Sequence, residues 1–199
     1  MPISQKNKII FVHVPKCAGS SIEYHFEMIK PGKVFYPEII FGWQNNSWSQ
    51  HWSFEQIIKE CKKLNINTDD FFSFSVVRNP WDRLVSSFFW RKTNPKFSME
   101  FKEFVKHFRF NNRVHFKPQH EFIIDKNGNQ MVDFVCRYEN LQEDFNFLCC
   151  KIGQEPKNLC RANKTNHKNY TEYYDNETID IVSEKYAKDI EYFNYKFGE

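Results

Sequence analysis

The chain has 199 residues, of which 18% are aromatic, including 22 phenylalanines, and 27% are charged. Its 28 basic and 25 acidic residues leave a formal net charge of +3, an excess too small to indicate a nucleic-acid-binding protein. The length favours a single domain, residues 1–199, with a core rich in phenylalanine. We therefore expect a globular protein with at most a local basic site for an anionic ligand.

No pair of cysteines has the two-residue gap of a zinc knuckle. No stretch approaches the roughly 18 apolar residues of a membrane span, and residues 1–8 are polar, which does not fit a signal peptide. We expect free thiols, no metal, no integral membrane segment and a cytoplasmic location. The cysteines are Cys17, Cys61, Cys136, Cys149, Cys150 and Cys160.

The first structural signal is a strand followed by a small-residue loop and a helix. Residues 9–14 form an apolar, β-branched run that predicts a buried strand ending at Pro15. A tight loop over 16–19 leads into a helix expected over 20–28. The N–H groups and the dipole at a helix N-terminus favour a phosphate or sulfate there. The residues expected to hold such an anion are Lys16, Cys17, Ala18, Gly19, Ser20 and Ser21.

This loop differs from the common nucleotide-hydrolase loop, in which the lysine directly follows the second glycine. Here Lys16 precedes Gly19. A strand–glycine–helix junction also occurs in α/β proteins that bind nothing at that place. Cys17 also has two interpretations. The positive field of the loop would favour a reactive thiolate. Alternatively, Cys17 is simply a small loop residue whose main chain contacts the anion.

A second buried strand is predicted over residues 71–77, and Arg78 follows it directly. Pro80 then opens a helix in the first-turn position that proline prefers. Ser86 lies one to two turns into that helix. Because ligands of open α/β sheets bind beyond the carboxyl ends of strands, we expect Arg78, Ser86 and the Lys16 loop at one rim. A salt bridge to an acidic side chain is the alternative for Arg78.

The other elements complete an α/β fold with a short parallel sheet flanked by helices. Residues 31–50 are aromatic and mostly loop, either lining a sugar or lipid pocket or simply packing. The further expectations are a capping box at Ser53–Gln56 that opens a helix to 64, a helix over 98–108, a hairpin of 122–125 and 130–135 around Asn127-Gly128, a helix over 139–152 ended by Gly153, and a final helix that Asn176 caps, running through Phe193.

The motifs HVPKCAGSSI and FSVVRNPWDRLVSSFFW resemble those of the sulfotransferase superfamily, specifically the carbohydrate branch with the heparan sulfate 2-O-sulfotransferase-like (sulfotransfer family 2) domain. The resemblance implies 3′-phosphoadenosine 5′-phosphosulfate as donor, adenosine 3′,5′-bisphosphate as product, a glycan or glycolipid hydroxyl as acceptor, and no metal. It also implies that the P-loop-like Lys16 loop holds the 5′-phosphosulfate, while Arg78 and Ser86 hold the 3′-phosphate.

The same resemblance assigns further roles. His51 falls where the family keeps its catalytic histidine, and Lys16 stabilises the leaving oxygen. Lys164, with Arg161 next, lies in a polar segment near the 3′-phosphate, although a solvated loop is an equal alternative. His120 is the second candidate for the base, whereas His13 fits a hydrogen-bonded core residue. The likeness weakens at residues 30–50 and 91–118, where substrate choice would lie.

Two other functions are open from the sequence. A nucleotide kinase-like phosphotransferase also uses a strand–loop–helix site, but its lysine follows the glycine and a magnesium-binding carboxylate ends a strand. A catalytically inactive glycan-binding module of the same fold is the other. The presence of Lys16, His51, Arg78 and Ser86 together favours the sulfotransferase.

Overall fold

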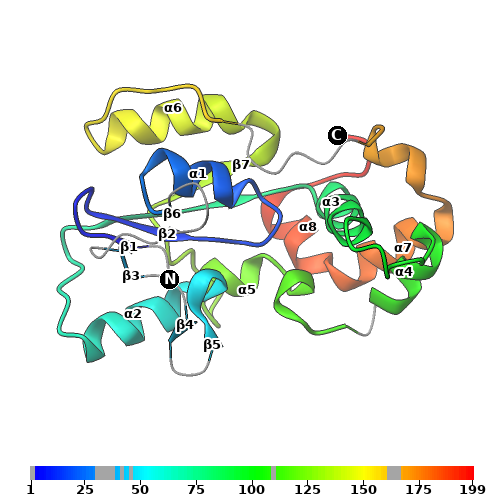
Figure 1. Cartoon of the computed structure of the whole chain (residues 1–199), viewed down its shortest axis with the longest axis horizontal. Coiled ribbons are helices and arrows are strands. Elements are labelled where there is room, and N and C mark those ends of the chain that lie inside the picture. Colours follow the sequence, from blue (N-terminus) through cyan, green and yellow to red (C-terminus); the bar gives the residue numbers. More distant parts are fainter. Residues whose placement is uncertain (1–2, 30–38, 41–42, 45–46, 109–110, 161–166) are drawn as a thin grey trace. The chain divides into compact units, whose positions relative to one another are not determined.

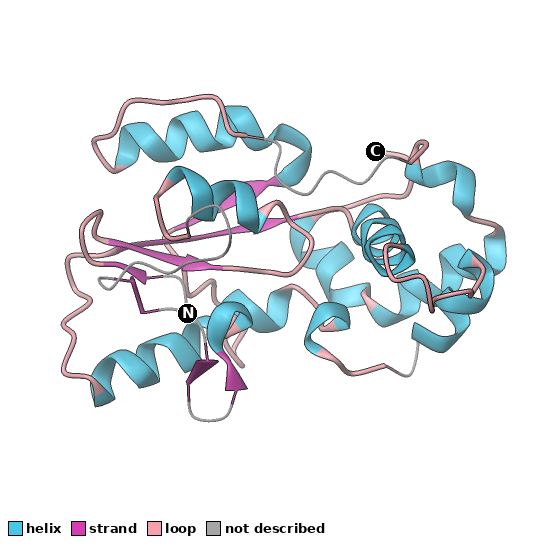
Figure 2. Cartoon of the chain, viewed as in Figure 1, coloured by secondary structure: helices cyan, strands magenta, loops and turns pink. Residues whose placement is uncertain are grey.

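The computed structural model of the chain describes residues 3–29, 39–40, 43–44, 47–108, 111–160 and 167–199. The chain forms two compact units, which can be followed by colour in Figure 1. The first unit comprises Met1–Val77 and Glu121–Ala162, and the second comprises Arg78–His120 and Asn163–Glu199. The described strands all belong to the first unit, as Figure 2 shows in magenta, whereas the described part of the second unit is built of helices and loops.

The first unit contains a five-stranded sheet with the order β3-β1-β2-β6-β7. Strands β2, β6 and β7 are parallel, which confirms the α/β class and the short parallel sheet. Strands β1 and β3, which were not expected from the sequence, extend the sheet beyond β2 in antiparallel pairs. The bounds are β1 Ile3–Ser4, β2 Ile9–Val12, β3 Ile39–Ile40, β6 Phe72–Val77 and β7 Phe134–Arg137, and a separate pair is formed by β4 Trp43–Gln44 and β5 Ser47–Trp48.

Strand β2 is buried along its whole length, as expected for a central strand of a parallel sheet with both faces covered. Its last residue, Val12, is in register with Ser75 of β6, and the Ser75 hydroxyl donates a 2.7 Å hydrogen bond to the Val12 carbonyl. The carboxyl ends of β2 and β6 therefore lie at the same edge of the sheet. The chain leaves β6 at this edge, and Arg78 is the first residue of the second unit.

Helices cover both faces of this sheet (Figure 1): α1 (Gly19–His25) and α6 (Leu141–Lys151) lie on one face, and α2 (Phe54–Lys63) lies on the other. Phe26, at the end of α1, packs against Phe74 of β6 and Phe145 of α6. The capping box that opens α2 is confirmed, since the side chains of Ser53 and Gln56 each bond the other's main-chain N–H. Helix α6 follows a short 3₁₀ turn, η3 (Tyr138–Asn140).

The predicted hairpin around Asn127-Gly128 is wrong as a pair of strands. A turn does occur there, with Gly128 at φ 88°, and Asp125 accepts hydrogen bonds from the main chains of Asn127 and Asn129. The preceding residues form the short helix α5 (His120–Ile123), and the two arms share only the bridge Ile124↔Gln130 among the described residues. Strand β7 pairs with β6 instead, because that pairing places Cys136 in the core.

The second unit packs four helices around aromatic rings. The helices are α3 (Pro80–Lys92), α4 (Phe101–Phe108), α7 (Asn176–Lys185) and α8 (Ala187–Phe193), with the 3₁₀ turns η2 (Val114–Phe116) and η4 (Tyr170–Tyr173) between them. The buried rings include Phe88, Phe101, Phe104, Phe108 and Phe116, which confirms the phenylalanine-rich core. Asp175 rather than Asn176 caps α7, and the expected single final helix is interrupted at Tyr186.

Candidate active site

The loop between β2 and α1 has an unusual backbone. Lys16 and Ala18 adopt left-handed conformations, with φ values of 70° and 59°, although neither is glycine. Left-handed residues between ordinary ones turn successive main-chain N–H groups toward one concave side, a shape typical of anion-binding loops. The Ser21 amide already donates to the Ala18 carbonyl at 2.9 Å, within the first helical turn. The predicted strand–loop–helix is therefore present, and α1 begins one residue before Ser20.

Gly19 is required by a close approach rather than by its φ angle. A Cβ atom placed on Gly19 would lie 2.0 Å from Nε2 and 2.2 Å from Cδ2 of the His13 ring. His13 is itself only 5% exposed, as expected for a hydrogen-bonded core histidine. The imidazole thus packs directly on the first turn of α1, where no side chain other than hydrogen fits.

The other loop residues differ in how their side chains are placed. Cys17 is buried, and its thiol donates to the Pro15 carbonyl at an Sγ–O distance of 3.6 Å. A contact between Cys17 and an anion in the loop would therefore come from its main chain. Ser21 is buried, while Lys16 and Ser20 are half-buried. All six cysteines lie within the described residues, and none of them forms a disulfide.

A buried cluster connects this loop to His51, which ends the 3₁₀ turn η1 (Ser49–His51). Nδ1 of His13 donates to Oε1 of Glu23 at 2.6 Å, and the Gln50 amide donates to both oxygens of Glu23 at 3.2 and 3.1 Å. Nδ1 of His51 donates to the His13 carbonyl at 3.0 Å, and the two rings meet edge to face with centroids 4.6 Å apart. The first unit thus brings His51 next to the residue that precedes the loop motif.

The His51 hydrogen bond determines which ring nitrogen carries the proton. A carbonyl oxygen only accepts, so Nδ1 of His51 must be the N–H donor. In the neutral ring the lone pair is then on Nε2, the atom that a general base uses.

Glu23 is a member of this cluster that the sequence interpretation missed. It is fully buried on α1, on the same face as Gly19, Ile22 and Phe26. The spacing of these four positions is that of the inner face of a helix. A carboxylate at such a position indicates a buried network of polar side chains, because a buried charge requires polar partners to offset its desolvation.

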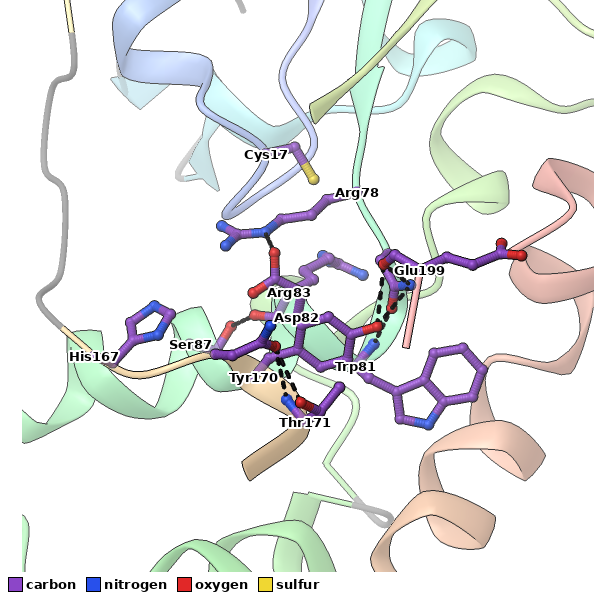
Figure 3. Close-up of polar contacts among 12 residues, drawn as sticks. Cys17, Arg78, Trp81, Asp82, Arg83, Ser87, His167, Tyr170, Thr171 and Glu199 are labelled. Atoms are coloured by element: carbon purple, nitrogen blue, oxygen red, sulfur yellow. Dashed lines mark hydrogen bonds and ion pairs between the residues drawn. The ribbon is translucent and has the colours of Figure 1, made fainter. Parts of the chain in front are cut away.

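In the second unit, Arg78 is 6% exposed, and its Nε donates to Oδ2 of Asp82 at 2.8 Å (Figure 3). The salt bridge considered as an alternative for Arg78 is therefore formed. Ser86 is also buried and lies one helical turn beyond Asp82 on α3. Because positions four apart share a helix face, Asp82 and Ser86 form one row on α3, and Arg78, which precedes the helix, joins this row through its ion pair with Asp82.

His120, the second candidate for the base, lies in the same unit as Arg78. Its Nδ1 is 2.6 Å from Oδ1 of Asp189, a fully buried carboxylate on α8. This partner was not expected from the sequence. By the same argument as for His51, the lone pair of a neutral His120 ring is on Nε2.

Lys164 and Arg161 lie outside the described residues, as do residues 31–38, 41–42 and 45–46 of the aromatic segment 31–50. The chain is described again from His167, whose ring stacks on Phe89 with centroids 5.0 Å apart. Phe89 is one turn beyond Ser86 on α3. His167, the last residue of the predicted polar segment, therefore packs against α3 one turn beyond Ser86.

Trp90, at the end of the second motif, and residues of the segment 91–118, where the resemblance weakens, form a partly exposed aromatic and basic surface. Trp90 is 45% exposed and stacks on His115, with the rings 5.1 Å apart and 8° from parallel. Arg91 lies over the Phe116 ring at 5.0 Å, and burial together with the charge of Arg113 lowers the pKa of Arg91. We call Trp90, Arg91, Arg113 and His115 the Trp90 surface.

Comparison with known proteins identifies the family. The sulfotransferase family profile matches residues 1–196, so the chain belongs to the sulfotransferase family. A protein of Archaeoglobus fulgidus described as uncharacterized is 33% identical over 103 residues, which cover 51% of this chain and 84% of that protein. No solved structure matches the chain significantly.

Two further observations concern the described residues only. None of their helices has the length and apolar character needed to cross a bilayer. They also contain no group of three or more histidine, cysteine or acidic side chains arranged to hold a metal ion.

Proposed function

We propose that this sulfotransferase moves the sulfuryl group of 3′-phosphoadenosine 5′-phosphosulfate to a hydroxyl of a glycan or glycolipid, with both units acting as one catalytic domain in the cytoplasm. The family assignment supports sulfuryl transfer in general. The observation that carries the specific proposal is the loop immediately before α1, in which Lys16 and Ala18 are left-handed, together with His51, which donates to the carbonyl of His13 just before that loop.

The residues present fit this donor chemically. The donor carries negative charge at both its phosphosulfate and its 3′-phosphate. The first unit contributes Lys16 and the left-handed loop before α1, and the second contributes the Arg78 guanidinium and the Ser86 hydroxyl. The Arg78 guanidinium, whose Nε donates to Asp82, carries a positive charge and N–H groups in a planar arrangement that suits a phosphate.

Each residue then has a defined task. When bound, the donor supplies a sulfuryl group activated by its phosphate leaving group. The Lys16 loop binds the phosphosulfate, and the Lys16 ammonium offsets the negative charge that develops on the bridging oxygen. Arg78 and Ser86 bind the 3′-phosphate. Nε2 of His51 accepts the proton of the acceptor hydroxyl as its oxygen bonds to sulfur and the bond from sulfur to the bridging oxygen breaks.

The test of donor binding compares two nucleotides that differ only in the 3′-phosphate. We expect wild type to bind adenosine 3′,5′-bisphosphate with micromolar affinity, about −8 kcal/mol, in isothermal titration calorimetry. Arg78→Ala should weaken that binding by about 10- to 100-fold, since charge-assisted hydrogen bonds contribute about 1.5–3 kcal/mol. Binding of adenosine 5′-monophosphate should stay unchanged.

Lys188→Ala is the matched control, because it removes a positive charge from an exposed position of α8 in the same unit. It should leave the affinity for both nucleotides unchanged. Absence of adenosine 3′,5′-bisphosphate binding to wild type would refute the proposed donor.

The two other functions make different predictions. A nucleotide kinase would be stabilised in a thermal shift assay by ATP with magnesium rather than by adenosine 3′,5′-bisphosphate. An inactive glycan-binding module would show no transfer of labelled sulfate to any acceptor. The position of Lys16 before Gly19 supports neither the nucleotide kinase nor the inactive glycan-binding module.

We propose that the Trp90 surface contacts the acceptor, because an exposed aromatic ring beside guanidinium groups suits a polar sugar. Labelled sulfate transfer to a panel of glycans and glycolipids identifies the acceptor. With it, Trp90→Ala should raise KM about threefold to tenfold, the loss expected for an aromatic contact of about 0.5–1.5 kcal/mol. Phe147→Ala, which removes an exposed ring of α6, is the control and should leave KM unchanged. An unchanged KM in Trp90→Ala would exclude this surface.

A further inference from the structure

Asp189 is a fully buried carboxylate that accepts three hydrogen bonds from two consecutive residues. Its Oδ2 accepts from the main-chain N–H of Gln119 at 2.7 Å. Its Oδ1 accepts from the main-chain N–H of His120 at 2.9 Å and from Nδ1 of His120 at 2.6 Å. Burying a carboxylate is unfavourable unless such donors compensate, so the position of Asp189 and the path of residues 119–120 depend on each other.

The side chain of Gln119 continues this network to Arg78. Gln119 is fully buried, its Oε1 accepts from the Arg78 main-chain N–H at 2.9 Å, and its Nε2 donates to the Arg78 carbonyl at 2.8 Å. A glutamine amide has one acceptor and one donor group side by side, so it pairs with a residue's main chain as a neighbouring strand would. These two hydrogen bonds fix the main chain of Arg78, the residue that directly follows β6.

We propose that Asp189 and Gln119 are positioning residues for donor binding. Asp189 fixes Gln119, and Gln119 fixes the main chain of Arg78, while Asp82 holds the other end of the same residue through Nε. The guanidinium is thus presented in one orientation before the nucleotide arrives, which reduces the cost of ordering it on binding. This inference rests on the proposed role of Arg78 in binding the 3′-phosphate.

The same carboxylate fixes the His120 ring. Since Asp189 accepts from Nδ1, it selects the tautomer that carries its proton on Nδ1. Nuclear magnetic resonance distinguishes the two ring nitrogens by their ¹⁵N shifts. This signature of the His120 ring reports directly on whether Asp189 occupies its position.

The test uses two variants and two nucleotides. Gln119→Met removes both bonds to Arg78 while keeping a side chain of similar length, and Asp189→Asn removes one acceptor while keeping the shape. The quantity measured by calorimetry is the ratio of the affinities for adenosine 3′,5′-bisphosphate and adenosine 5′-monophosphate. We expect both variants to lower this affinity ratio about fivefold or more, which is within the contribution of one charge-assisted hydrogen bond. The affinity for adenosine 5′-monophosphate should change little. In Asp189→Asn the ¹⁵N shifts of His120 should also change.

A purely structural role predicts a different result. Asp175→Ala is the control, because it removes the cap of α7 in the same unit without touching Arg78, Gln119 or Asp189. It should lower Tm and leave the affinity ratio unchanged. If Gln119→Met also lowers only Tm and keeps the wild-type ratio, the positioning role is refuted. Should Asp189→Asn fail to fold, Gln119→Met decides alone.

Failure of the proposed function looks different from failure of this inference. If wild type itself binds both nucleotides with equal affinity, Arg78 does not bind a 3′-phosphate and the proposed donor is wrong. If wild type discriminates and Gln119→Met discriminates equally well, only the positioning role is wrong.

Discussion

Replacement of His51 by alanine is expected to lower kcat by about 10²–10⁴-fold, the usual contribution of a general base. Nδ1 of His51 is fixed by the His13 carbonyl, so the variant loses a proton acceptor whose orientation is already set. Binding of adenosine 3′,5′-bisphosphate should change little, because the proposed role of His51 concerns the acceptor hydroxyl and not the nucleotide. Initial rates at saturating donor, together with calorimetric Kd values, measure the two effects separately.

His107→Ala serves as the control, since His107 is an exposed histidine of α4. It should leave kcat and Kd at their wild-type values. An unchanged kcat in His51→Ala would remove His51 from the mechanism. His120, held by Asp189, would then be the next base to test by the same substitution.

The second large effect is expected for Gly19→Ala. The added methyl group would overlap the His13 ring, which Glu23 holds on one side and the His51 ring packs against on another. Overpacking of a buried site costs about 1–3 kcal/mol, and relief requires the Lys16 loop to move. We therefore expect a lower free energy of unfolding in urea and a loss of adenosine 3′,5′-bisphosphate binding.

A double-mutant cycle with His13→Ala tests this cause. Removing the imidazole makes room for the methyl group, so Gly19→Ala should cost less in the His13→Ala background than in wild type. The coupling expected between contacting residues is about 0.5–3 kcal/mol. Additive effects on unfolding would contradict the proposed clash.

The parts of the fold that the sequence predicted well are those with local signals. The apolar run before Pro15, the Ser53–Gln56 box and Pro80 each act within a few residues, and β2, α2 and α3 appear where these signals placed them. The hairpin prediction was wrong because the turn signal at Asn127-Gly128 is local, whereas the pairing of strands depends on residues far apart in the sequence. The choice of β6 as the partner of β7 depends on residues about 60 positions away, as the Ser73–Asp133 bonds show.

For the candidate site, too, residues in local motifs were predicted and residues that depend on distant contacts were missed. Lys16, Gly19 and Arg78 were predicted from motifs, but Glu23 and Asp189 were missed although both lie on the buried faces of their helices. The spacing of Asp189 from Tyr186 and Phe193 is that of an inner helix face. An acidic residue in such a row signals a buried network, yet the sequence does not reveal which donors meet it.

The network around Arg78 also has a consequence for the order in which the protein forms during synthesis. The bond between Gln119 and Asp189 spans 70 positions, and the bond from the Asn79 side chain to the Glu199 carbonyl spans 120. The first unit is complete in sequence at Ala162, before α8 has been made. Because domains on a growing chain fold from the N-terminus onward, the Lys16 loop can form while Arg78 still lacks Asp189. A nascent chain therefore forms the Lys16 loop first and the network that holds Arg78, with its proposed role in 3′-phosphate binding, last.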